Sequence, residues 1–247
     1  MKAAVSILLA ALVGSFAMVF VWPAHDEIWQ RKQEMLDVVV KVDVADGSGS
    51  GTVIHSGEDG VFILTNHHVL PDKGIPDQNI TVLSWVYPDA NSPAMPLSQE
   101  AVVVADDEKA DLALLKVKDP EWRTHYVAAV LGTKDHIQPT EPVYAVGSAL
   151  GERTFVTEGM ISLTYSKVEE GGPNLVMISA PIIWGNSGGA AFVKRNGHYV
   201  FIGVPERGHV AKGLFVAHMG YAIAMSSIRE FLAAHDFGDI LKRPRAA

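Results

Sequence analysis

Short runs of β-branched and aromatic residues, separated by turn-forming residues, follow one another along most of this chain. Typical runs are VFILT at residues 61–65, ITVLSWVY at residues 80–87 and LVMIS at residues 175–179, and Gly, Pro, Asp or Asn stands in nearly every gap. This pattern is typical of antiparallel strands in a barrel or sandwich. The exception is SSIREFLAAH at residues 226–235, whose apolar positions recur at helical spacing. We therefore expect an all-β domain that ends in a short helix.

The N-terminus holds the longest apolar stretch of the chain. Residues 3–22 carry no charge and supply the roughly 20 residues that a helix needs to cross a bilayer. We expect a retained transmembrane anchor, because the stretch is long and bulky Trp22 stands near the plausible cleavage site. A cleaved signal peptide, followed by secretion, is the alternative. Lys2 before the stretch and Asp26 and Glu27 after it predict that the remaining chain lies on the extracytoplasmic side, periplasmic or extracellular.

The expected organisation has three parts. Residues 1–24 form the signal-anchor or signal peptide, residues 25–34 (HDEIWQRKQE) form a polar or helical spacer, and residues 35–240 form the folded domain. With 48% hydrophobic residues in a chain of 247, a sizeable core can be buried.

Charge and cysteine content exclude several classes of function. A formal net charge of -8 argues against a nucleic-acid binder, since such proteins usually carry basic patches. The sequence has no cysteine, which rules out disulfides, thiolate metal sites and a thiol nucleophile. Any covalent chemistry must use another group.

A serine lies among glycines in WGNSGGAAF at residues 184–192. Ser187 would need a neighbouring base to act as a nucleophile, and donors aimed at the oxyanion that forms on attack. The backbone N–H groups of Gly185 and Ser187 would supply those donors if the turn points them the same way. A plain glycine-rich turn is the alternative.

Two adjacent histidines and an aspartate offer partners for this serine. His67 and His68 end an apolar run, and Asp111 opens another, ADLALLKV at residues 110–117. A metal site is disfavoured, because neighbouring residues of a strand point to opposite faces and no metal-binding spacing accompanies the pair. A carboxyl at the edge of a buried strand needs a partner, and a histidine would be a good one. A surface acid among other acids is the alternative for Asp111.

The order His, Asp, Ser along the chain is that of chymotrypsin-like enzymes. The sequence resembles the HtrA (Deg) branch of the trypsin-like serine proteases, and the matching segments cover most of residues 47–228. They are GSGSGTVI, LTNHHVL, DLALLKV, GSALGERTFVTEGMIS, GNSGG and GYAIAMSSI, in that order. The resemblance implies a double antiparallel β-barrel, with barrels at about residues 35–120 and 135–225.

The resemblance also assigns roles. The family pattern T-N-x-H-V matches TNHHV here, which makes His68 the base and leaves His67 in the variable position. Asp111 would orient His68, Ser187 would attack the substrate carbonyl, and the amides of Gly185 and Ser187 would form the oxyanion hole. We therefore expect a serine endopeptidase that forms an acyl-enzyme and needs no cofactor or metal.

The chain departs from the family around the substrate pocket. Trp184, Ala190 and Ala149 stand where the family usually has proline, and Trp184 would narrow the entrance. The resemblance implies a pocket with no acid at its base, which predicts a broad preference for a small or medium apolar residue before the cut. The residues implied to line it are Pro181, Ile182, Ile183, Trp184, Ile202, Gly203 and Val204.

The resemblance has further implications for partners. The expected substrates are proteins or peptides, the membrane is contacted through the N-terminal helix, and a homo-oligomer such as a trimer is an option by resemblance alone. About ten residues follow the predicted C-terminal helix, so we expect no PDZ domain of the kind many family members carry. Two other interpretations stay open: a catalytically silent peptide-binding or sensor module of the same fold, and an unrelated β protein with chance motifs.

Overall fold

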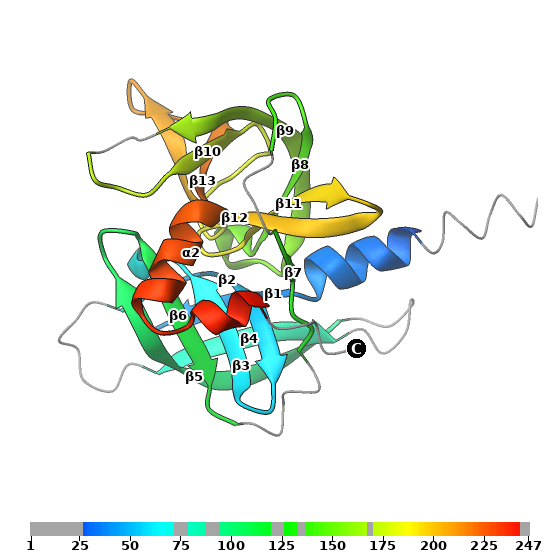
Figure 1. The fold of residues 1–247 in the computed structure, drawn as a ribbon, viewed down its shortest axis with the longest axis vertical. Helices are drawn as coiled ribbons and strands as arrows, with labels where there is room; N and C mark the ends of the chain where they lie inside the picture. The colour runs from blue at the N-terminus through cyan, green and yellow to red at the C-terminus, as the bar shows by residue number, and fades with distance from the viewer. Residues whose placement is uncertain are drawn as a thin grey trace, which may run out of the picture.

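The computed structural model describes residues 27–71, 79–86, 94–119, 126–132, 137–166 and 170–242. Two β-barrels stack on each other, the first below and the second above in Figure 1. The all-β double barrel expected from the sequence is thus confirmed. The predicted membrane span lies outside the described residues, and within those residues no helix has the length and apolarity needed to cross a bilayer.

The first barrel is a closed antiparallel sheet with strand order β1-β2-β3-β6-β5-β4. Its interior is filled by side chains such as Val42, Val53, Ile63 and Leu115, none of which is exposed. The strands are β1 (Val39–Val44), β2 (Gly47–Gly57), β3 (Gly60–Thr65), β4 (Ile80–Val86), β5 (Met95–Asp107) and β6 (Leu112–Val117).

The second barrel has strand order β11-β8-β9-β10-β13-β12, and pairing of β11 with β12 closes the ring while β7 joins β12 in parallel. Val143, Ile161, Ile178 and Val193 pack in its interior. The strands are β7 (Val130–Leu131), β8 (Pro142–Gly147), β9 (Phe155–Ser166), β10 (Leu175–Ile178), β11 (Ala190–Arg195), β12 (His198–Ala211) and β13 (Leu214–Ala224).

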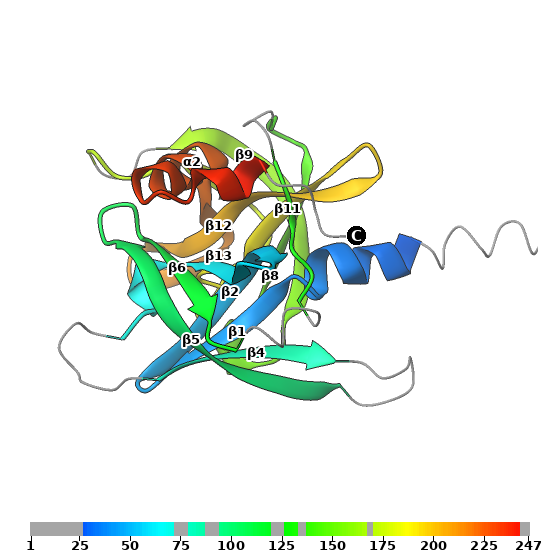
Figure 2. The same ribbon diagram turned by 60° about the horizontal axis from the view of Figure 1, so that its bottom comes forward.

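The predicted terminal helix is present as α2 (Met225–Ala234), followed by η5 (Gly238–Lys242). Its apolar face contributes Ile228 and Phe231 to a core cluster that also contains residues of both barrels. Phe237 extends this contact to β3, where its ring lies 5.7 Å from that of Phe62. Figures 1 and 2 show the helix lying across the junction of the two barrels. The helix therefore joins the barrels into one core.

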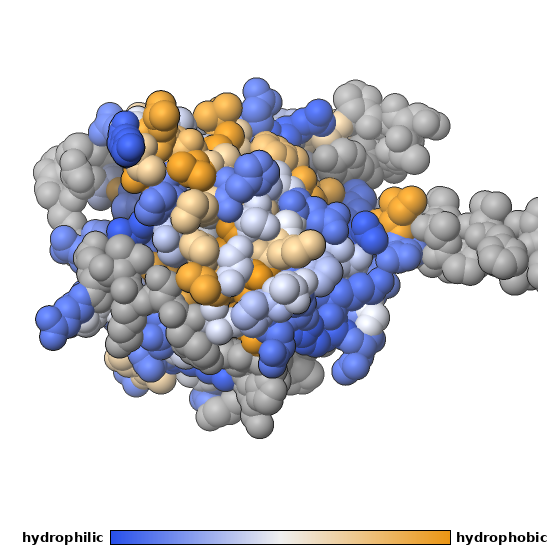
Figure 3. Space-filling model, turned by 90° about the horizontal axis from the view of Figure 1, so that it is seen from above, coloured by the Kyte–Doolittle hydropathy of each residue, from blue (hydrophilic) through white to orange (hydrophobic). Residues whose placement is uncertain are grey.

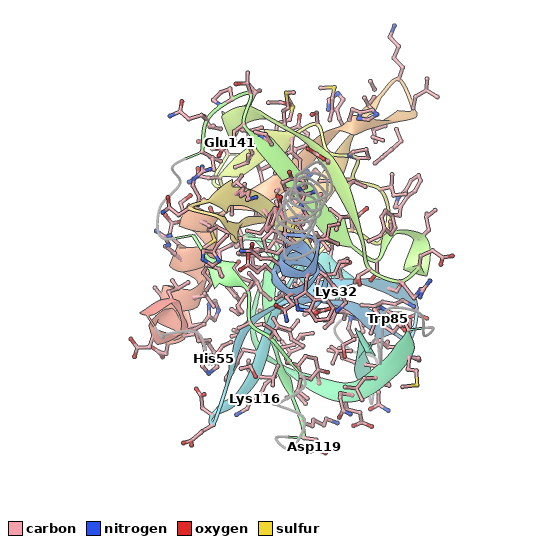
Figure 4. All side chains as sticks on the ribbon, turned by 90° about the vertical axis from the view of Figure 1, so that its right-hand side faces the viewer. Lys32, His55, Trp85, Lys116, Asp119 and Glu141 are labelled. Carbon is pink, nitrogen blue, oxygen red and sulfur yellow. The ribbon has the colours of Figure 1, made fainter. Side chains whose placement is uncertain are left out.

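Residues 27–31 are α-helical and continue into the π-helical turn η1 (Lys32–Leu36). In Figure 4 this helix points toward the viewer, and Lys32 lies at a height between Glu141 of the second barrel and Lys116 of the first. The buried Glu34 carboxylate accepts hydrogen bonds from Tyr199 N at 2.8 Å and His198 Nδ1 at 2.7 Å. The segment expected to be a spacer is thus packed onto the second barrel in its described part.

Candidate active site

His68 and Asp111 meet at one end of the first barrel. His68 lies in the 3-10 turn η2 (His67–Val69) after β3, and Asp111 precedes β6, the strand that pairs with β3. Asp111 Oδ2 is 2.8 Å from His68 Nδ1, and Asp111 Oδ1 accepts the His68 backbone N–H at 3.0 Å. Asp111 has a left-handed backbone (φ 49°), and its carbonyl accepts a hydrogen bond from the Asn66 amide at 2.8 Å. With Nδ1 donating to the carboxylate, His68 Nε2 is the acceptor that faces the cleft.

The neighbouring histidine has a carboxylate of its own. His67 Nδ1 lies 2.5 Å from Asp106 Oδ1, and both side chains are half-buried. Two His–Asp pairs therefore lie side by side, which explains how this strand end accommodates both imidazoles.

The loop around Ser187 requires glycine at two positions. Gly185 has φ +93° and a Cβ there would lie 2.5 Å from Ser148 O, while Gly188 has φ +84° and a Cβ there would lie 2.0 Å from Ser50 O. Any other residue would be strained in its backbone and would clash with a neighbouring segment. The glycines therefore allow the loop to pack directly against two other chain segments.

Two amides of this loop are available to a ligand. Leu150 N donates to Trp184 O at 2.7 Å, and since the carbonyl and the following N–H of a trans peptide point in opposite directions, the Gly185 N–H faces away from Leu150. Within the described parts of the chain, neither Gly185 N–H nor Ser187 N–H has an acceptor. Both could donate to an oxyanion.

Ser50 connects the two barrels at this loop, a role that sequence reasoning did not assign. Its Oγ donates to Gly185 O at 2.6 Å and accepts the Ser148 N–H at 2.8 Å, and its N–H donates to Ser187 O at 2.7 Å. Thr65 Oγ1 in turn donates to Ser50 O at 2.7 Å. The only sequence signal was the small polar residue between glycines in GSGSGTVI, a pattern typical of close backbone approach.

The Ser187 hydroxyl is turned toward β12. Its Oγ donates to the backbone carbonyl of Glu206 at 3.0 Å, and no hydrogen bond joins it to His68 among the described residues. The structure thus brings His68 and Asp111 into direct contact, whereas Ser187 is linked to their pocket through Glu206, one of its lining residues. A change of the Ser187 χ1 rotamer would redirect the hydroxyl, and catalytic hydrogen bonds often tighten only when substrate binds.

A pocket of about 460 Å³ opens beside His68 between the two barrels. Both barrels contribute to it, and half of its lining residues carry formal charges. The lining residues are His67, His68, Glu108, Lys109, Asp111, Gly172, Pro173, Leu175, Glu206 and Arg207.

Glu206 is a buried acid within this pocket wall. Its side chain is only 3% exposed, Oε1 accepts a hydrogen bond from Arg207 Nε at 2.7 Å, and Oε2 finds no partner among the described residues. Burial raises the pKa of the Glu206 carboxyl above its ordinary value; Arg207 opposes this effect, and the negative charge of Asp111 adds to it.

The residues that the resemblance implies for the substrate pocket differ in burial and do not all lie beside the serine loop. Trp184 is 71% exposed beside the serine loop, and Ile182 is buried beneath it. Ile202 and Val204 are buried in the barrel cores, and a Cβ at Gly203 would meet the backbone of β13. The part of β12 that contacts the serine loop lies further along, since Gly188 N donates to Pro205 O at 3.0 Å and Ser187 to Glu206 O. Pro181 and Ile183 are half-buried in the same loop as Trp184.

A metal-binding cluster of three or more histidine or acidic side chains is not found in the described parts of the chain. The groups that can act chemically here are a histidine oriented by a carboxylate, a serine hydroxyl across the cleft and two backbone donors.

A double β-barrel with these groups in the cleft between its halves has the architecture of the chymotrypsin-fold peptidases. Comparison with known families agrees: residues 49–204 match the trypsin-like peptidase domain. The chain belongs to that family.

Its relatives include proteases of the HtrA type. The chain is 34% identical to the magnetosome formation protease MamE of Paramagnetospirillum magneticum over 74% of its length, and 30% identical to the serine protease HTRA1B of Danio rerio over 86%. It is also 33% identical, over 58% of its length, to a probable periplasmic serine endoprotease, DegP-like, of Brucella suis. The chain spans only 23%, 39% and 25% of these three relatives.

Solved structures share the fold. The HtrA-type protease AlgW, solved with a tripeptide, aligns with a TM-score of 0.60 at 23% identity and covers 86% of this chain and 63% of its own. The protein Deg5 aligns with a TM-score of 0.62 at 24% identity and covers 84% of this chain and 92% of its own.

Proposed function

We propose that this chain is a serine endopeptidase that hydrolyses peptide bonds of proteins through Asp111, His68 and Ser187. The observation that carries the proposal is the hydrogen-bonded pair of His68 and Asp111, which lines a pocket together with Glu206, the residue whose carbonyl accepts the Ser187 hydroxyl. The relatives named as a serine protease and as a probable serine endoprotease support the same activity.

In the proposed mechanism, Ser187 Oγ attacks the substrate carbonyl carbon while its proton passes to His68 Nε2. Asp111 stabilises the resulting imidazolium, and the amides of Gly185 and Ser187 donate to the oxyanion. The imidazolium then protonates the leaving amine as the C–N bond breaks, which leaves an acyl-enzyme. Water activated by His68 hydrolyses the ester and restores Ser187.

Before attack, the Ser187 hydroxyl must leave Glu206 O and turn toward His68. This frees the Glu206 carbonyl to accept an N–H from an extended substrate that lies along β12, as expected for β-strand addition. The resting hydrogen bond is therefore exchanged for a substrate hydrogen bond when the peptide binds.

Specificity follows from the uncharged segment before the serine. We expect a broad preference for small or medium apolar side chains before the cut, because Pro181, Ile182 and Ile183 place no charge near the serine.

Location follows from the N-terminus. The apolar residues 3–22 would anchor the chain in a membrane with its peptidase domain outside the cytoplasm, and the DegP-like relative, named as probably periplasmic, supports that location. A homo-oligomer, such as a trimer, is a further option, which rests on the resemblance to the HtrA family alone.

A silent peptide-binding module is the second candidate. The observation that favours it is the Ser187 hydroxyl, which is hydrogen-bonded to Glu206 O instead of His68. Such a module would bind peptides along β12 without cleaving them.

Cleavage by the full chain separates the two candidates. The wild-type chain and the Ser187→Ala variant, both kept in mild detergent, are incubated with unfolded proteins, and the products are sequenced by mass spectrometry. We expect cleavage by the wild type and none by the variant. If neither chain cleaves but both bind the same peptides, the endopeptidase proposal fails and the binding module stands.

A further inference from the structure

The ring of Phe215 fills a slot beside Ser187. One wall of this slot is the segment 182–184, which is tied to β13 because Ile182 N donates to Ala217 O at 3.2 Å. The other wall is β12, reached through the hydrogen bond from Ser187 to Glu206 and continuing to Gly208. Phe215 comes from β13, the strand that pairs with β12.

The Phe215 ring touches both walls. It stacks on the indole of Trp184, with ring centroids 5.2 Å apart and planes inclined by 28°. The tip of the ring also reaches the backbone of Gly208, where an added Cβ would be 2.1 Å from Phe215 Cζ. The ring can approach so closely only because residue 208 has no side chain.

Under the proposed function, a peptide whose carbonyl lies on Ser187 and whose backbone follows β12 would direct its preceding side chain between the two segments that flank the serine. Those segments are 182–184 and the Glu206–Gly208 part of β12, the two walls that Phe215 bridges.

We propose that Phe215 occupies the subsite for the substrate residue that precedes the scissile bond, and so determines specificity. The proposal rests on the proposed function and deepens it. With the ring in place, the slot admits only small side chains; larger apolar ones enter when the ring swings out. The indole of Trp184 and the open backbone face of Gly208 would then receive an apolar side chain of the substrate in place of Phe215.

The surroundings of Phe215 allow the ring to leave. The pairing of β12 with β13 is shifted between Gly208 and His209, next to the ring. Val210, opposite Phe215 in the hairpin, is 60% exposed, and Leu214 is 71% exposed, so a displaced ring would meet apolar side chains. Figure 3 shows apolar residues gathered on the second barrel when it is seen from above. The exposed large apolar residues of this barrel are Leu150, Phe155, Met160, Leu163, Trp184, Val210 and Leu214.

Binding of two product peptides tests the proposal without relying on cleavage. The full chain carrying Ser187→Ala, in mild detergent, is titrated calorimetrically with hexaalanine and with a hexapeptide of five alanines ending in phenylalanine. Phe215→Ala should bind the phenylalanine peptide at least tenfold more tightly than the parent does, and hexaalanine within twofold. The matched control Leu214→Ala, which alters the exposed neighbour, should change neither affinity by more than twofold.

The proposal is overturned if Phe215→Ala changes both affinities by the same factor, or if Leu214→Ala has the same effect as Phe215→Ala. Phe215→Leu, which keeps a smaller apolar side chain and an unfolding temperature close to the parent's, should give an intermediate ratio of affinities. Labelling of Ser187 by a fluorophosphonate is measured separately on the chain with its serine intact. If this chain is not labelled at Ser187, the endopeptidase proposal fails. The ratio of the affinities for the phenylalanine peptide and hexaalanine still decides the role of Phe215.

Discussion

At the scale of single residues, two carboxyl groups of opposite character share the pocket beside His68. Both oxygens of Asp111 are engaged by His68 through its ring nitrogen and backbone N–H. Glu206 has one oxygen paired with Arg207 and the other buried without a partner among the described residues. Burial therefore destabilises the charged form of the Glu206 carboxyl and raises its pKa.

Replacing Asp111 with Asn should reduce turnover by about four orders of magnitude, because an amide no longer fixes the productive tautomer of His68. Asp106→Asn is the matched control, since Asp106 forms the same kind of pair with His67. Steady-state hydrolysis of a peptide by the full chain gives both values. A greater loss in Asp106→Asn than in Asp111→Asn would show that the proposed base is the wrong histidine.

Glu206→Gln should stabilise the fold at high pH and not at low pH. The folded-state pKa of Glu206 lies above the ordinary value of 4.5, so ionisation costs folding free energy as pH rises above that value, and below it the wild-type group is neutral in both states. Removing a buried, half-satisfied charge is worth about 1 to 3 kcal/mol. Thermal unfolding at pH 4 and pH 8 measures the difference.

The exposed Glu108, on the rim of the same pocket, is the matched control for this experiment. Glu108→Gln should leave the unfolding temperature at both pH values nearly unchanged. An equal loss of stability at pH 4 and pH 8 in Glu206→Gln would mean that the charge of Glu206 is not the cause.

At the scale of elements, the N-terminal helical segment, residues 27–36, is held to the β11–β12 hairpin by side chains distant in sequence. Gln30 Nε2 donates to Gly197 O at 2.8 Å, and Lys194 Nζ lies 2.8 Å from Glu27 Oε1. Glu34 is the buried member of this set. These contacts fix the segment to the second barrel.

Glu34→Gln should cost about 1.5 to 3 kcal/mol of folding free energy at pH 7, the size of hydrogen bonds to a charged group. Burial works to raise the pKa of Glu34, but hydrogen bonds from His198, Tyr199 N and Gln30 outweigh it and lower the pKa below 4.5. The stabilisation is therefore present above that pH and is lost as pH falls through the folded-state pKa.

Urea unfolding of both chains between pH 3 and pH 7 measures this loss. Glu27, whose side chain is 43% exposed and which pairs only with Arg31 and Lys194 in the described structure, supplies the control Glu27→Gln. We expect Glu27→Gln to change the free energy of unfolding only slightly, because its ion pairs lie at the surface. If Glu34→Gln lowered the free energy of unfolding by the same amount at every pH down to 3, the charge of the Glu34 carboxylate would not be the source of the stabilisation.

How far the sequence predicted these features depends on their range along the chain. The strands, the terminal helix and the His68–Asp111 pairing follow from local patterns and one family motif. The position of β12 beside Ser187 did not follow, since shifts in the β12–β13 pairing after Pro205 and after Gly208 change which residues face the serine. The roles of Ser50 and Phe215 likewise depend on contacts between segments that no local pattern connects.

At the scale of the whole molecule, the two barrels share a continuous core. The same cluster holds Leu64 and Leu112 of the first barrel, Phe201 of the second and Phe231 of α2. The pocket beside His68 lies between the barrels, so its geometry depends on this shared packing. The molecule should therefore unfold as one unit.

Phe231→Ala should destabilise the whole chain by about 3 to 5 kcal/mol, the usual cost of removing a buried aromatic ring, and should lower the temperature of a single unfolding transition. Differential scanning calorimetry measures the shift. Glu230→Ala, one position away on the exposed face of α2, is the control and should leave the transition nearly unchanged. Two separate transitions, only one of them shifted, would mean that the barrels fold independently.

The central claim, that Ser187 is a nucleophile activated by His68 and Asp111, is tested most directly by a fluorophosphonate that reacts only with activated serines. The full chain is incubated with the probe in mild detergent, digested and mapped by mass spectrometry. We expect one phosphonylated residue, Ser187, with labelling abolished in His68→Ala and retained in His67→Ala. An unlabelled wild-type chain, or label on a serine other than Ser187, would contradict it.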